Sequence, residues 1–263
     1  MRHGLYIAPF GELADPRAVA DVAAAAEAAG WDGFFLWDHM LRPVEQTTHL
    51  GDAWISLAAA AMATHRVVLG PLVTPPVRRR VPKLIREAIA LDRLSNGRLI
   101  LGLGLGVDSG GELTRFGEMT DIVARGDLLD EAVAVLEQAW TGGPVNFHGR
   151  YVTVDDVAFL PRAVQQPHVP MWFASRGNAP LRPIRRAAMH GQGLHIVESD
   201  RDGVLRMIDT LASVRGSIEG YDIAYSIPPG THADHSDWGL TWALHGTGPI
   251  ATVAEVLAAI KML

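Results

Sequence analysis

An aspartate and a histidine stand side by side directly after the apolar run "GFFLW" (33–37). Histidine ordinarily titrates near neutrality, so His39 could move a proton or hydrogen-bond a heteroaromatic ring. The carboxylate of Asp38 could hold the imidazole in one tautomer, or contact a ring edge itself. Position alone leaves three interpretations open: a catalytic pair, a ligand site, or only a polar cap on a loop.

A second candidate site lies where the apolar run 170–175 meets a helical segment. Free amides and the helix dipole at such a junction favour an anion such as phosphate. The same side chains could instead do no more than cap the helix. The candidates for anion binding are Ser175, Arg176, Gly177 and Asn178.

Two further strand ends could bring main chain close to a ligand. The segment "GPLVTPP" (70–76) predicts an irregular exit that exposes backbone amides, or simply a turn. In "LGLGLG" (101–106), the alternating Gly102, Gly104 and Gly106 leave one strand face bare, so another group can approach the backbone. Packing inside the protein explains these glycines equally well.

The loop "THADHSDW" (231–238) contains side chains that often bind metals, namely His232, Asp234, His235 and Asp237. They lack the helical spacing of a zinc-protease motif, so no metal site is predicted. A metal-dependent hydrolase that uses these histidines with Asp38 and His39 stays as an alternative. The sequence has no cysteine and no G-x-S-x-G motif, which argues against covalent hydrolysis.

The elements that must position these residues alternate along the chain. Strands are predicted at 4–9, 33–37, 66–73, 98–105, 170–175, 193–197, 221–227 and 240–246. Helices are predicted at 15–30, 53–64, 79–95, 121–140, 179–191, 201–215 and 252–263, with a hairpin at 145–160. Eight βα units predict an α/β protein, a (β/α)8 TIM barrel over residues 1–263 as a single domain with a small hairpin insertion. An open doubly wound sheet is less consistent, because no glycine-rich phosphate turn follows the first strand.

Composition restricts the class of protein. The chain has 263 residues, 48% of them apolar, and a net charge of −6. The negative charge argues against a nucleic-acid partner, and no segment predicts a signal peptide or a membrane span. With no cysteine, the chain fits a reducing compartment, and we expect it in the cytoplasm.

Three segments together resemble the bacterial luciferase-like superfamily. They are "AEAAGWDGFFLWDHML", "LDRLSNGRLILGLGLG" and "FLPRAVQQPHVPMWFASRGN", and the resemblance runs from residue 4 to about residue 195. Members of this superfamily are (β/α)8 barrels that bind reduced FMN or the deazaflavin coenzyme F420. The "LDRLSNGRLILGLGLG" segment is the most specific of the three.

The resemblance implies roles for individual residues. Asp38 and His39 would contact the ring system and place a proton donor, as the catalytic residues. Leu72 and Val73 fall where many members carry a non-proline cis peptide under the ring. The implied cofactor contacts are Asp38, Leu72, Val73, Thr74, Gly104, Ser175, Arg176, Gly177 and Asn178, and the implied pocket wall is Phe10, Trp37 and Trp54.

One departure concerns the acid–base group. Members that use the deazaflavin often carry a glutamate just after the strand-four glycines, where this chain has Val107 and Asp108.

The predicted function is therefore a flavin- or deazaflavin-dependent oxidoreductase acting on a small organic substrate. With FMN it would act as a monooxygenase that inserts oxygen into the substrate. A separate flavin reductase would then supply the reduced FMN. With F420 it would transfer a hydride, with His39 as acid or base. A non-catalytic flavin-binding homologue is a further alternative, and a homodimer is expected.

Overall fold

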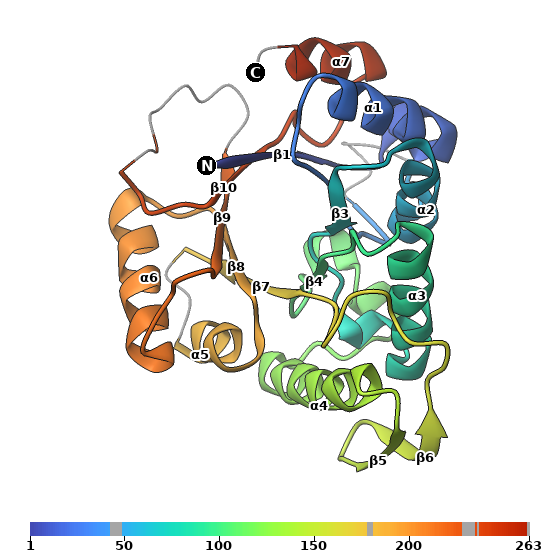
Figure 1. Cartoon of the computed structure of the whole chain (residues 1–263), viewed down its shortest axis with the longest axis vertical. Helices are drawn as coiled ribbons and strands as arrows, with labels where there is room; N and C mark the ends of the chain where they lie inside the picture. Colours follow the sequence, from blue (N-terminus) through green and yellow to red (C-terminus); the bar gives the residue numbers. More distant parts are fainter. Residues whose placement is uncertain (43–48, 178–180, 228–234, 236, 262–263) are drawn as a thin grey trace.

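Eight parallel strands form the centre of the fold, with the strand order β3-β2-β1-β10-β9-β8-β7-β4. Figure 1 shows this computed structural model, with helices arranged around the strands. It describes the chain except residues 43–48, 178–180, 228–234, 236 and 262–263. The predicted (β/α)8 TIM barrel is confirmed.

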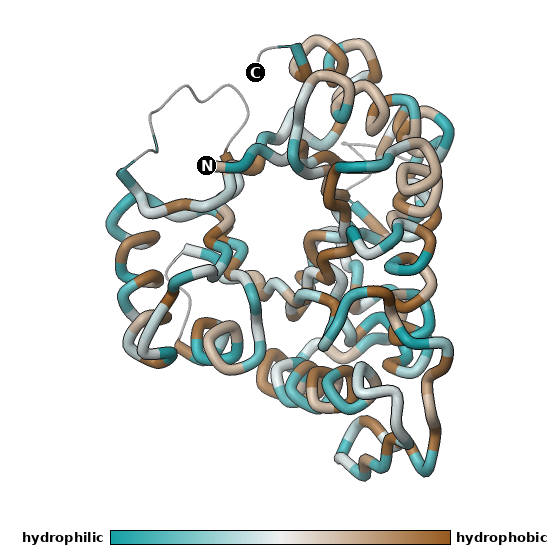
Figure 2. Tube along the Cα trace, viewed as in Figure 1, coloured by the Kyte–Doolittle hydropathy of each residue, from teal (hydrophilic) through white to brown (hydrophobic). Residues whose placement is uncertain are grey.

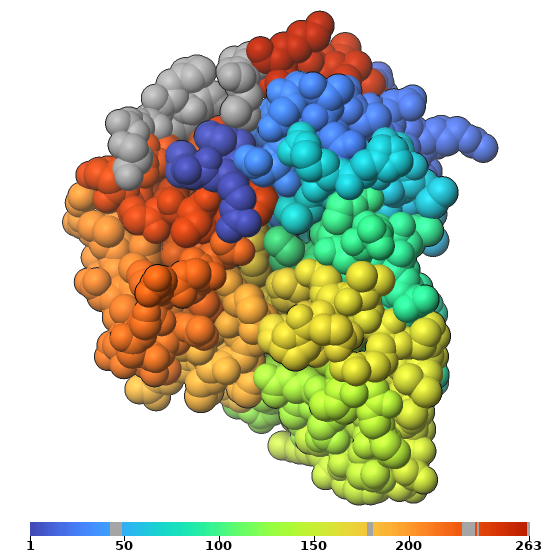
Figure 3. Space-filling view, in the orientation of Figure 1, coloured from blue at the N-terminus to red at the C-terminus, as the bar shows by residue number. Residues whose placement is uncertain are grey.

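The element bounds lie close to those predicted. The barrel strands are β1 (Arg2–Ile7), β2 (Gly33–Leu36), β3 (Val68–Pro71), β4 (Leu101–Leu103), β7 (Met171–Arg176), β8 (Gly193–Val197), β9 (Asp222–Ile227) and β10 (Trp242–His245). The helices are α1 (Pro16–Ala28), α2 (Ala53–Ala63), α3 (Val81–Leu94), α4 (Ile122–Trp140), α5 (Leu181–His190), α6 (Arg201–Arg215) and α7 (Val253–Ile260). Strands β5 (Pro144–His148) and β6 (Thr153–Ala158) form the predicted hairpin, which projects beyond α4 (Figures 1 and 3).

The barrel closes where β3 meets β4. Parallel bridges join Leu69 to Leu99 and Thr74 to Leu103, and the Ile100 amide donates to the Leu69 carbonyl over 2.9 Å. The strand predicted at 98–105 is longer than the observed β4, which spans only Leu101–Leu103. The residues around β4 pair with the β3 segment only through isolated bridges, and so they do not count as a regular strand.

Glycine makes this closure possible. A Cβ at Gly70 would lie 1.9 Å from the Ile100 carbonyl oxygen, and one at Gly102 would lie 2.2 Å from that of Pro71. No side chain fits at either position without moving the backbone. The sequence predicted that the strand-four glycines leave one face free for another group to approach. At Gly102 that group is the main chain of the neighbouring strand β3.

Hydrophobic residues line the strands around the barrel axis (Figure 2). Inside the barrel, Phe35, Trp172 and Trp242 pack together with ring centroids 5.5 to 5.8 Å apart. These rings fill the barrel interior on the side of the amino ends of the strands, so a ligand can enter only nearer the carboxyl ends.

Within the described residues, no helix is long and apolar enough to cross a membrane.

Candidate active site

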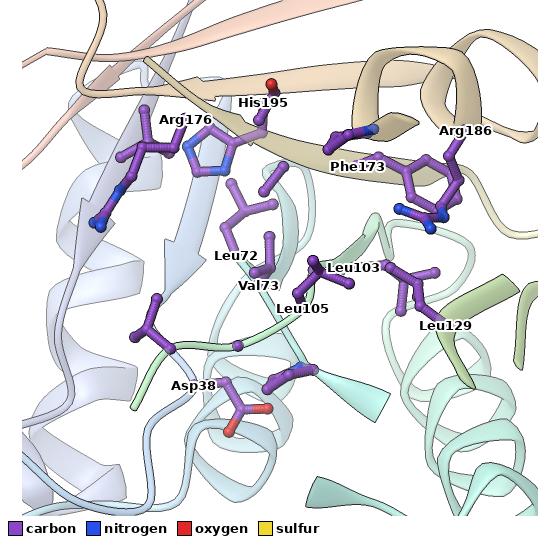
Figure 4. Close-up of a pocket in the computed structure, with 18 of the residues that line it drawn as sticks. Asp38, Leu72, Val73, Leu103, Leu105, Leu129, Phe173, Arg176, Arg186 and His195 are labelled. Carbon is purple, nitrogen blue, oxygen red and sulfur yellow. The ribbon is translucent and has the colours of Figure 1, made fainter. Parts of the chain in front are cut away.

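A cavity of about 590 Å³ opens at the carboxyl ends of the strands. Figure 4 shows Asp38 at one end of it and Phe173, Arg186 and Leu129 together at the other. Between them lie Leu72, Val73, Leu103 and Leu105. The cavity thus has a polar end and a largely apolar middle, as small-molecule sites commonly do.

Asp38 is held at the polar end by three donors. Its carboxylate accepts from the Thr74 hydroxyl over 2.6 Å and from the Trp54 indole over 3.3 Å. The guanidinium of Arg79 forms an ion pair with it at 3.0 Å. Because these partners occupy the buried carboxylate, Asp38 is suited to fixing the wall of the site rather than to moving a proton.

His39 is oriented by a residue far away in the sequence. Its Nδ1 lies 2.9 Å from Oε2 of Glu112, so the hypothesis that Asp38 fixes the imidazole tautomer is wrong in this geometry. Glu112 is 1% exposed and also pairs with Arg78 at 3.0 Å. Burial acts to raise the pKa of Glu112, but the hydrogen bond with His39 and the charges of His39 and Arg78 outweigh it and lower that pKa.

Sequence reasoning missed Glu112, because it looked for an acidic residue directly after the strand-four glycines. Asp108, near that position, turns away and accepts from the backbone amides of Leu113 (2.7 Å) and Thr114 (3.1 Å). These bonds fix the loop between two short 3-10 helices, Ser109–Gly111 and Thr114–Phe116. Glu112 lies between those helices, where no periodic pattern could have indicated that it is buried.

The floor of the cavity contains the non-proline cis peptide between Leu72 and Val73, as the resemblance implied. The Leu72 carbonyl accepts from the Tyr6 hydroxyl over 2.9 Å. A Cβ at Gly104 would lie 2.5 Å from a Val73 methyl group, so glycine lets this segment project under the cavity. Thr74 does not line the cavity; it lies behind the floor and supports Asp38.

A second histidine in the cavity has no counterpart in the sequence predictions. His195 is 1% exposed, and its Nε2 lies 2.7 Å from the Ser226 hydroxyl. Its ring meets the ring of Tyr6 edge-on, with centroids 5.4 Å apart. Burial lowers the pKa of His195 to about 3, so this imidazole is neutral at physiological pH.

The predicted anion-binding turn is only partly as expected. Ser175 is buried at the cavity, and among the described residues its hydroxyl has no hydrogen-bond partner. The Gly177 amide is occupied, because it donates to the Val197 carbonyl over 3.0 Å. Arg176 lines the cavity and pairs with the exposed Glu198 at 2.9 Å. Asn178 lies outside the described residues.

The aromatic residues expected at the pocket wall do not line the cavity. Trp54 lies behind it, where its indole donates to Asp38 and to Thr74. Phe10 and Trp37 pack edge to face, each with its ring centroid 6.0 Å from that of His39. These three residues therefore support the polar end from outside.

The histidine-rich loop gives no support for a metal site among the described residues. His235 packs between aromatic rings, 5.4 Å from Tyr225 and 4.4 Å from Trp238 by ring centroid. Asp237 pairs with Arg201 at 2.7 Å. His232 and Asp234 lie outside the described residues.

The cavity fits a flavin-type cofactor. The segment Leu72–Val73 and the bare Gly104 give a smooth apolar surface for a planar ring. The Ser175 hydroxyl is buried and has no partner in the part of the chain that the structure describes, so a phosphate oxygen would satisfy it.

Comparison with known proteins agrees with this geometry. The sequence profile of the luciferase-like monooxygenases matches residues 3–237. The F420-dependent glucose-6-phosphate dehydrogenase of Microbacterium testaceum (strain StLB037) is 29% identical over 251 residues, which cover 91% of this chain and 71% of that protein. The chain spans about half the length of several other dehydrogenases of the same name.

Two solved structures share the fold. An F420-dependent secondary alcohol dehydrogenase, in complex with an F420–acetone adduct, superposes with a TM-score of 0.76 at 23% identity, over 86% of this chain and 68% of its own. The oxygenating component of 3,6-diketocamphane monooxygenase from Pseudomonas putida, in complex with FMN, superposes with a TM-score of 0.71 at 18% identity. The superposition covers 86% of this chain and 66% of that chain. By its sequence over nearly its whole length, the chain belongs to the luciferase-like monooxygenase family.

Proposed function

We propose that this protein oxidises the hydroxyl group of a small organic substrate, or reduces the matching carbonyl, with coenzyme F420. The family makes it an oxidoreductase that uses FMN or F420. F420, when bound, accepts or supplies a hydride at its ring. The protein must then bind the ring, exclude water and move one proton.

The observation that carries the proposal is the pair formed at the cavity by the half-buried His39 and the buried Glu112. An alcohol that loses a hydride must also lose its hydroxyl proton, and an imidazole can accept that proton. The Nδ1 atom of His39 is engaged by Glu112 at 2.9 Å, which leaves Nε2 for the substrate. The carboxylate of Glu112 then stabilises the imidazolium that forms, as the aspartate of a catalytic triad does for its histidine.

The other polar residues hold this pair in place. Arg78 neutralises Glu112 at 3.0 Å, and Arg79 neutralises Asp38 at 3.0 Å. Each buried carboxylate thus has its own cation, which reduces the free-energy cost of keeping both charged. We assign Asp38, Leu72, Val73 and Gly104 to contacts with the ring, and His39 to acid–base catalysis.

The relatives support the choice of F420 over FMN. The dehydrogenase from Microbacterium testaceum carries F420 in its name and matches 91% of this chain. Glu112 supplies the buried carboxylate that was missing from the sequence-based case for hydride transfer. A separate flavin reductase is required only if the cofactor is FMN.

Titration of the apoprotein with FMN and with F420, followed by ring fluorescence, tests the cofactor. We expect micromolar or tighter binding of F420, and loss of its absorbance when a secondary alcohol is added and oxidised. Failure of F420 to bind, or binding of FMN with oxygen-dependent turnover, would overturn the proposal.

We also propose a homodimer that forms through α2. On this helix Ile55 is 62% exposed and Met62 is 67% exposed, and partner contact would bury both apolar side chains. Light scattering of the wild-type protein and of Ile55→Glu tests this: a dimer that becomes a monomer supports it, and a wild-type monomer contradicts it.

A further inference from the structure

We propose that His195 is a cofactor-positioning residue, whose imidazole Nδ1 forms a hydrogen bond with a polar group on the inner edge of the bound ring. The inner edge is the one that points down the barrel, away from the carboxyl ends of the strands. The inference rests on the proposed function only for the choice between F420 and FMN.

Strand β8 places His195 at the bottom of the cavity. Successive side chains of a strand point to opposite faces. A Cβ at Gly193 would lie 2.3 Å from the Trp172 ring, so Gly193 faces the barrel interior, and His195, two residues further on, shares that face. Its partners in the sheet are Ala174 of β7 and Ala224 of β9. His195 therefore lines the cavity directly above the layer of aromatic rings that fills the barrel.

Tyr6 connects His195 with the floor of the cavity. Its hydroxyl donates to the Leu72 carbonyl over 2.9 Å, and its ring meets that of His195 edge-on, with centroids 5.4 Å apart. Strands β2 and β8 stand on opposite sides of the closed barrel. Accordingly, His195 and Asp38 lie on opposite sides of Leu72 and Val73 in Figure 4. A ring that rests on this floor has Asp38 toward one side and His195 toward the other.

The imidazole of His195 is held at one nitrogen and unpartnered at the other. Its Nε2 lies 2.7 Å from the Ser226 hydroxyl. Its Nδ1 is buried and has no hydrogen-bond partner among the described residues. The Tyr6 hydroxyl is already engaged by Leu72. Buried polar atoms in native proteins are usually satisfied, so the Nδ1 atom at the cavity indicates a polar group of a ligand.

The chemistry of His195 differs from that of His39. Burial lowers the pKa of His195 to about 3, so the imidazole is neutral and has one donor and one acceptor nitrogen. The Ser226 hydroxyl can donate to Nε2 or accept from it, which lets Nδ1 act as acceptor or as donor. Such a group suits a neutral partner rather than an anion. It positions a ligand and does not exchange a proton near neutral pH.

Two groups on the edge of a flavin-type ring have the required chemistry. The imide edge, an N–H between two carbonyls, is common to F420 and FMN. A hydroxyl on the other end of the ring is present in F420, where FMN carries methyl groups. Both groups lie in the plane of the ring, so a ring whose face rests on Leu72 and Val73 can offer either of them to His195.

Affinity for the oxidised cofactor tests this contact without any turnover. His195→Leu keeps the volume of the side chain and removes the nitrogen. We expect it to weaken binding of the cofactor that the wild type accepts, F420 or FMN, roughly 5- to 20-fold in a fluorescence titration. His195→Asn, whose amide can stand in the place of Nδ1, should regain most of this affinity. Equal affinity of His195→Leu and the wild type would overturn the proposal.

Two further proteins make the comparison secure. His190→Leu is the control, because it removes an imidazole outside the cavity and should bind the cofactor like the wild type. Thermal unfolding shows whether His195→Leu is folded, and His195→Val replaces it in the same titration if it is not. Reduced turnover of His195→Leu at unchanged cofactor affinity would contradict a positioning role.

A pH titration of bound F420 identifies the group on the ring. Ionisation of the F420 hydroxyl changes the visible absorbance of the ring. If His195 contacts the hydroxyl, the pH of this change differs between the complexes of the wild type and His195→Leu. If His195 contacts the imide, affinity falls and the pH of the change stays the same. An affinity loss seen with FMN, in a protein that does not bind F420, would support the contact and count against the proposed function.

Discussion

The Nδ1 atom of His39 and the Oε2 atom of Glu112 lie 2.9 Å apart, although 73 positions separate the two residues in the chain. His39 follows β2, and Glu112 lies in the connection between β4 and α4. The carboxyl ends of the barrel strands bring the two segments together over the cavity. Arg78, which follows β3, completes the group from a third connection.

Replacement of His39 by alanine should lower turnover by roughly 10²- to 10⁴-fold, because it removes the group that takes the substrate proton. F420 affinity should change little, since the ring rests mainly on the apolar floor. Steady-state kinetics and a fluorescence titration measure the two quantities. His190→Ala is the control, because His190 is paired with Glu137 at 2.8 Å outside the cavity. Unchanged turnover in His39→Ala would remove His39 from the mechanism.

Glu112→Gln should affect both stability and turnover. Arg78, whose side chain is 5% exposed, loses its charged partner, and the free energy of unfolding should fall by about 3 kcal/mol. Turnover should fall by roughly tenfold or more, because the imidazole loses its orienting carboxylate. Urea unfolding and kinetics check the two effects. Glu87→Gln is the control, because Glu87 is more exposed and pairs with Arg79 and Lys83. It should change neither the free energy of unfolding nor turnover much.

His195 should make the protein sensitive to acid. Burial lowers its pKa to about 3 in the folded protein, against an ordinary value of 6.5. Between these values the unfolded chain binds a proton that the folded chain does not. The free energy of unfolding should therefore fall as the pH is lowered below 6.5, by up to about 1.4 kcal/mol per pH unit from this group.

Urea unfolding at pH 7.0 and about pH 5.5 measures this effect above the range in which ordinary carboxylates titrate. His245, whose pKa burial lowers to about 4, contributes with the same sign, so the comparison with His195→Gln isolates the share of His195. His195→Gln should lose less stability on acidification than the wild type. His65→Gln, at an exposed position, should behave like the wild type. A pH dependence that is the same in His195→Gln and the wild type would contradict the assignment.

Gly102→Ala should destabilise the barrel closure. The new Cβ would lie 2.2 Å from the Pro71 carbonyl oxygen, which is main chain and cannot rotate away. The free energy of unfolding should fall by about 3 kcal/mol. Gly143→Ala, where the nearest atom is 3.6 Å away, is the control. Equal stability of the two variants in thermal unfolding would show that β3 and β4 can separate without cost.

The sequence by itself determined the fold class and most of the elements. The apolar run 33–37, the helix signals around Asp15 and Pro16, and the alternation of strands and helices all depend on local periodicity and capping. Strand β8 and helix α6 were predicted at their observed bounds, 193–197 and 201–215. The end of β2 also placed Asp38 and His39 at the cavity.

Only the tertiary structure decided which groups meet there. Glu112, His195 and Arg186 lie in segments with no motif, and each faces the cavity because of how distant elements pack. Trp54 and Thr74 were expected beside a ligand, yet they lie behind Asp38. Within helices and strands, local patterns report whether a residue is buried but not which distant residue it is buried against, because that contact depends on the closure of the barrel and the course of its connections.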